Sequence, residues 1–77
     1  MDDIIWRFSF PMRKGVLDND YVFYSDGRIL HCYDKTISKI NIEEFVSAEQ
    51  IPIEERNMMI ANAPETLKDF IKNILEI

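Results

Sequence analysis

The segment Tyr21–Tyr33, with the sequence YVFYSDGRILHCY, limits the fold more than any other part of the chain. Asp26-Gly27 lies at its centre, and such a pair between runs of aromatic and β-branched residues is typical of a two-residue β-hairpin turn. That turn requires positive φ at both central residues, which Gly adopts freely and Asp adopts more readily than most residues. The sequence therefore predicts two antiparallel strands joined at Asp26-Gly27.

The hairpin register predicts which side chains share a face of the sheet. With a two-residue loop, Tyr24 lies opposite Ile29 and Tyr21 lies opposite Cys32. Side chains alternate along a strand. One face then carries Tyr21, Phe23, Leu30 and Cys32, and the other carries Val22, Tyr24, Ile29, His31 and Tyr33. We expect the first face to form the core, and the second to be either another packed layer or a half-exposed aromatic surface. A slip of one residue would exchange these faces.

The N-terminal segment Ile4–Phe10 predicts a third strand. Trp6, Phe8 and Phe10 alternate with polar residues, which gives one strongly apolar face. Pro11 ends the strand or places it at an edge. The simplest sheet is a three-stranded antiparallel meander, and Thr36–Ile40 is either a loop or a short fourth strand.

The second half of the chain predicts helices. Asn41 and Glu44 have the spacing of a capping box and predict a short helix at Ile42–Ala48. Pro52 favours the first turn of a second helix, which runs to about Asn62. The third helix, Pro64–Leu75, has an apolar stripe with helical spacing. The stripe consists of Leu67, Phe70, Ile71, Ile74 and Leu75.

Together these elements predict an α+β fold: an N-terminal three-stranded antiparallel sheet, a meander with an Asp26-Gly27 hairpin, followed by two to three helices packed on one face. The 77 residues, of which 47% are hydrophobic, predict a single compact domain over residues 1–77. A single Cys excludes an internal disulfide. The acidic start and the lack of a long apolar run predict no signal sequence, no membrane span and a cytoplasmic location.

The net charge of −5 is concentrated in the second half of the chain. Residues 1–40 carry six acidic and six basic side chains, whereas residues 41–77 carry eight acidic and three basic ones. An acidic surface repels phosphate backbones and attracts basic partners. Nucleic acid is therefore not the expected partner.

The residues that usually carry chemistry are few. His31 and Cys32 are the only His and Cys, and neighbouring strand residues point to opposite faces, so they cannot act together on one metal ion or as a nucleophile with its base. Glu54 and Glu55 point about 100° apart on a helix and make no catalytic dyad. The sequence predicts no catalytic residue, no cofactor site and no metal site, and hence not an enzyme.

The chain is therefore predicted to be a small non-catalytic interaction module that binds an unknown protein partner or itself. The candidate surfaces are the aromatic sheet face, with Tyr24, His31, Tyr33 and the nearby Arg28, and the acidic helical surface, with Glu54 and Glu55. One alternative is single-stranded nucleic-acid binding through the sheet aromatics and nearby Arg and Lys. Another is an acidic inhibitor of a nucleic-acid enzyme. Of the adjacent Met58 and Met59, either one is exposed for binding or the helix is buried on both sides.

Overall fold

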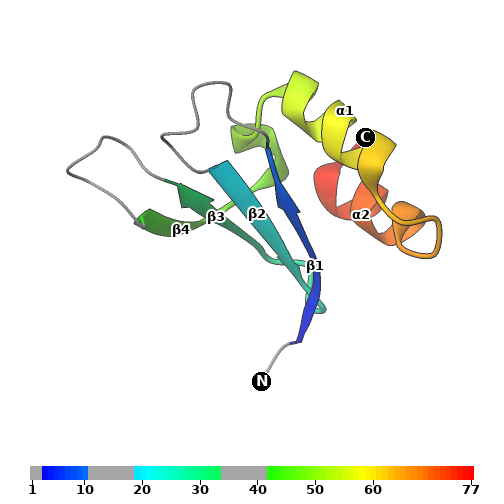
Figure 1. Cartoon of the computed structure of the whole chain (residues 1–77), viewed down its shortest axis with the longest axis horizontal. Coiled ribbons are helices and arrows are strands. Elements are labelled where there is room, and N and C mark those ends of the chain that lie inside the picture. Colours follow the sequence, from blue (N-terminus) through cyan, green and yellow to red (C-terminus); the bar gives the residue numbers. More distant parts are fainter. Residues whose placement is uncertain (1–2, 11–18, 34–41) are drawn as a thin grey trace. The chain divides into compact units, whose positions relative to one another are not determined.

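A computed structural model describes residues 3–10, 19–33 and 42–77 of the chain. The elements in chain order are strands β1 (Ile4–Ser9), β2 (Asn19–Tyr24), β3 (Ile29–Tyr33) and β4 (Ile42–Val46), the 3-10 helix η1 (Ala48–Gln50), and helices α1 (Ile53–Asn62) and α2 (Lys68–Leu75). The strands form one antiparallel sheet in the order β1-β2-β3-β4 (Figure 1). The predicted α+β meander followed by helices is confirmed, and the sheet has one strand more than expected.

Contacts within the chain group it into two compact units, Met1–Phe45 and Val46–Ile77. The sheet belongs to the first unit, apart from the last residue of β4. The 3-10 helix and both α-helices belong to the second unit.

The β2–β3 hairpin has a three-residue loop, so the predicted register was wrong by one residue. The Tyr24 amide donates to the Arg28 carbonyl at 3.0 Å, which leaves Ser25, Asp26 and Gly27 in the loop. Gly27 alone of these three has a positive φ, of 94°, whereas a two-residue type I′ turn would need one at Asp26 too. The Asp26 carboxylate instead accepts from the Arg28 amide at 3.0 Å. This local bond and the left-handed glycine favour the longer loop.

The observed register redistributes the side chains of β3. Phe23 lies opposite Ile29, and Tyr21 lies opposite His31. Ile29, which we expected on the second face, is therefore buried beside Tyr21 and Phe23. Strand β1 adds Trp6 opposite Phe23 and Phe8 opposite Tyr21, after an irregularity between Ile4 and Trp6. We call this side of the sheet the stacked face; its rings are Trp6, Phe8, Phe10, Tyr21, Phe23, His31 and Tyr33.

Strand β4 corrects the prediction of a helix at Ile42–Ala48. Ile42, Phe45 and Val46 suit a strand, and the charged Glu43 and Glu44 suit its position at the edge of the sheet. The capping-box spacing that misled the prediction occurs again at Ser47 and Gln50, where it is used: the Ser47 amide donates to Gln50 Oε1 at 2.8 Å as η1 begins. Asn41 and Thr36–Ile40 lie outside the described residues.

The second unit is held together around buried Ile51, Met59, Ile71 and Leu75. The Arg56 guanidinium donates to the carbonyl oxygens of Ile51 at 3.0 Å and Leu75 at 3.2 Å, and so ties the start of α1 to the end of α2. Helix α1 ends at Asn62 as predicted. Helix α2 begins at Lys68, four residues later than predicted, because residues 65–67 form turns after Pro64.

Phe70 and Met58 of the helical unit are both exposed, although the sequence predicted Phe70 in the apolar stripe and left the exposure of Met58 open. Phe70, a member of the predicted stripe, is 36% exposed, whereas its neighbour Ile71 is fully buried. Met58 is 46% exposed while Met59 is fully buried, so α1 is not buried on both sides.

Candidate interaction surface

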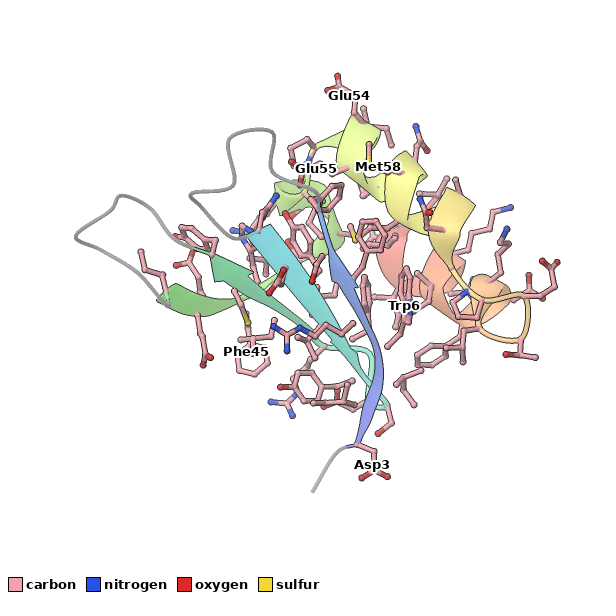
Figure 2. The ribbon with its side chains drawn as sticks, in the orientation of Figure 1. Asp3, Trp6, Phe45, Glu54, Glu55 and Met58 are labelled. Carbon is pink, nitrogen blue, oxygen red and sulfur yellow. The ribbon has the colours of Figure 1, made fainter. Side chains whose placement is uncertain are left out.

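The side of the sheet opposite the stacked face, which we call the open face, carries a cluster of apolar and charged side chains that are exposed or half-buried. It includes Ile4, Arg7, Tyr24, Arg28 and Phe45. Phe45 is 54% exposed and Ile4 is 61% exposed. Phe45 and Trp6 lie on opposite sides of the sheet (Figure 2). Both faces of the sheet thus carry aromatic side chains, but the two faces differ in how far these side chains are exposed to solvent.

Arg28 organises the open face. Its guanidinium carbon lies 4.8 Å from the centre of the Phe45 ring and 5.4 Å from that of Tyr24. The two rings lie 6.1 Å apart. The Nε of Arg28 also donates to the Asp26 carboxylate at 2.6 Å. Because the hairpin loop holds Asp26, the arginine is fixed over the rings in a cation–π arrangement before any partner binds.

Farther along the open face, a second ion pair joins β1 to β2. The Arg7 guanidinium donates to the Asp20 carboxylate at 2.8 Å. The Arg28–Asp26 and Arg7–Asp20 pairs each have an arginine that is largely in solvent, and surface pairs of this kind contribute little to stability, about 0–1 kcal/mol each. Their effect is to give the open face charges of both signs.

Cys32 lies on the open face and is half-buried. Burial raises the pKa of its thiol, and the nearby carboxylates of Glu43 and Asp20 raise it further, while Arg7 opposes them. A raised pKa leaves less reactive thiolate at neutral pH. The thiol of Cys32 is therefore less reactive near neutral pH than a free cysteine.

The stacked face places His31 between two phenol rings. Its ring centroid lies 4.3 Å from that of Tyr21 and 4.4 Å from that of Tyr33. The His31 Nε2 and Asn19 Oδ1 are 2.6 Å apart and hydrogen-bonded. The Tyr33 hydroxyl donates to the Glu44 carboxylate at 3.0 Å, a bond that raises the pKa of Tyr33. These contacts occupy His31 and Tyr33 within the sheet.

The residues predicted to bind a partner are thus spread over three surfaces. Tyr24 and Arg28 lie together on the open face, but His31 and Tyr33 lie on the stacked face, so the predicted grouping of Tyr24 with them was wrong. Glu54 is exposed on α1, and Glu55 is half-buried. The sequence reasoning missed Phe45 because its segment was assigned to a helix. Reading IEEFV as an edge strand would have placed Phe45 beside the hairpin.

Among the described residues, no group of three or more His, Cys, Asp or Glu side chains is placed to hold a metal ion. None of the helices described here has the length and apolar character needed to cross a membrane.

Comparison of the chain with models of protein families gave no match, and neither did comparison with curated proteins or with solved structures.

Proposed function

We propose that this protein is a non-catalytic interaction module that binds a protein partner through the open face of its sheet. The observation that carries the proposal is the exposure of Phe45, which packs against Arg28 and Tyr24 on that face. Aromatic residues and arginine are the types most enriched where protein–protein interfaces gain their binding energy. An exposed ring already held by an arginine also loses little conformational entropy when a partner covers it.

The charges of the open face favour a protein over a nucleic acid. A single-strand binding surface combines exposed rings with cations that contact phosphates. Here Arg7 and Arg28 each pair with an aspartate, and the chain has a net charge of −5, which opposes a phosphate backbone. Mixed charges around an apolar centre instead resemble the polar rim and apolar core of a protein interface.

The test replaces Phe45 with the photo-crosslinking residue benzoylphenylalanine. The same residue at Ile77, which is 42% exposed at the C-terminus, is the matched control. Each tagged protein is incubated with a nuclease-treated lysate, irradiated and purified. We expect a crosslinked protein from position 45 that is absent from position 77.

Three outcomes have distinct meanings. Equal crosslinking from both positions would show nonspecific contact and contradict the proposal. A product of twice the chain mass would identify a second copy as the partner. Retention of nucleic acid alone, in a parallel sample without nuclease, would overturn the proposal in favour of a single-strand binding surface.

A further inference from the structure

Helix α1 presents an exposed surface built from two neighbouring rows of side chains. Residues four apart lie above one another on a helix. One row is Ile53, Asn57 and Ala61, and the adjacent row is Glu54, Met58 and Asn62. All six side chains are exposed. We call these two rows the α1 surface; Glu54 and Met58 project from it in Figure 2.

The composition of the α1 surface is unusual for a solvated helix face. Ile53 is 49% exposed and Met58 is 46% exposed. Glu54 is the only charged residue among the six. The exposed side of α2, by contrast, includes the charged Asp69 and Lys72. The side of α1 with Met59 and Ile60 already supplies buried apolar contacts, so Ile53 and Met58 are not needed for the core.

The geometry points to a helix as the occupant, and the charge points to a basic one. Rows of side chains four apart form ridges, and the groove between two ridges accepts a ridge of a second helix. Ala61 is small enough to permit close approach. Residues 46–77 carry six acidic and three basic side chains, and Arg56 is engaged with two carbonyl oxygens. A second copy would bring the same net charge of −5, which opposes self-association through this surface.

We propose that the α1 surface binds an amphipathic helix of a basic partner protein. Apolar residues of that helix pack on Ile53, Ala61 and Met58, and a Lys or Arg pairs with Glu54. The inference does not depend on the open face, since the two surfaces share no residue. A helix of ten residues is about 15 Å long. Such a contact suits a transient interaction or one part of a larger interface.

The probe for this inference is a fluorescein-labelled peptide of about 14 residues. Its Leu residues are spaced to lie on one face of a helix, and its Lys residues lie on the opposite face. Its binding to the full chain is measured by fluorescence anisotropy at about 0.15 M salt, where long-range attraction is screened. We expect saturable binding that Met58→Lys weakens by at least about tenfold. Ile77→Lys and Phe45→Lys make the same charge change at exposed apolar positions elsewhere, and we expect either to weaken binding by about twofold at most.

Each other outcome overturns the inference in a distinct way. Lack of saturable binding by the unmodified chain would exclude the α1 surface as a site for such helices. Equal losses of affinity in all three variants would mean that unspecific charge attraction holds the peptide. A loss of affinity in Phe45→Lys alone would place the peptide on the open face. Equal binding of a Leu/Glu peptide of the same pattern would contradict a basic partner. A dimer in sedimentation that Met58→Lys dissociates would identify a second copy instead.

Discussion

The two faces of the sheet use the same types of residue for different purposes. On the stacked face, Phe23 and Trp6 have ring centroids 5.6 Å apart, and Phe23 is fully buried. On the open face, Phe45 and Tyr24 have ring centroids 6.1 Å apart, but Phe45 is mostly exposed and lies next to a guanidinium. Aromatic content alone therefore does not distinguish the buried face of this sheet from its exposed face. Exposure and charged neighbours do.

The largest expected effect is the loss of stability on truncating the buried ring. Phe23→Ala should lower the free energy of unfolding by about 3–5 kcal/mol, because it removes buried area and leaves a cavity. Urea denaturation followed by circular dichroism measures it. The matched change Phe45→Ala should cost less than about 1 kcal/mol, because that ring is already largely in water. Similar losses in the two variants would refute the difference between the faces.

A smaller loss of stability is expected at the β2–β3 loop, whose length decides on which face of the sheet each β3 side chain lies. Gly27→Val should cost about 1–2 kcal/mol, because an L-residue with a side chain is strained at positive φ. Apart from Gly27 and its two chain neighbours, no heavy atom of the described part of the chain lies within 4 Å of an added Cβ, so the cost comes from the backbone. Asp26→Gly tests the loop length. In a two-residue type I′ turn it would be tolerated or stabilising, but here it removes the Asp26–Arg28 bonds and should destabilise.

The register explains how much of the structure could be predicted. The alternation in β1 and the pattern around Asp26-Gly27 predicted the strands and the hairpin, because those signals are local. Loop length was not predictable in the same way, since Asp-Gly suits both a two-residue turn and the last two positions of a three-residue loop. The one additional loop residue places Ile29 in the core and puts Tyr24 on the opposite face of the sheet from His31 and Tyr33. The predicted grouping on one face therefore holds for Tyr24 and Arg28 but not for His31 and Tyr33.

Strand β4 was missed for a different reason. Local propensity at Ile42–Val46 is ambiguous, and the capping-box spacing of Asn41 and Glu44 favoured a helix in isolation. Pairing at the edge of the sheet decides the outcome, and pairing is a tertiary property that propensity does not contain. Phe45 gained its place on the open face from that pairing. The exposed Met58, by contrast, was one of the two alternatives that helical geometry had predicted.

On the stacked face, the bond between Tyr33 and Glu44 predicts a pH dependence at high pH. The pKa of Tyr33 is raised above its ordinary value of 10.0, chiefly because its hydroxyl donates to the Glu44 carboxylate. The neutral phenol is thus favoured in the folded state, so the hydrogen bond contributes to the free energy of unfolding. This contribution is complete below pH 10 and is lost as the pH rises through the folded pKa. Glu44→Gln should lower the pKa of Tyr33 toward its ordinary value, as measured by phenolate absorbance against a Tyr33→Phe reference. An unchanged titration would show that the bond does not persist in solution.

The smallest expected effect concerns Cys32 on the open face, where the rate of thiol alkylation reports the burial and the charges around the side chain. Its pKa is raised first by burial and then by Glu43, so alkylation by iodoacetamide should be slower near neutral pH than for a free thiol. Glu43→Gln should shift the pH–rate profile of alkylation to lower pH, and Arg7→Gln should shift it to higher pH, because Arg7 favours the thiolate. The two opposite shifts distinguish electrostatics from simple accessibility, which would change the rate at every pH without moving the profile. Identical profiles in the two variants would mean that burial alone sets the thiol pKa, and that the charges of the open face are screened by water.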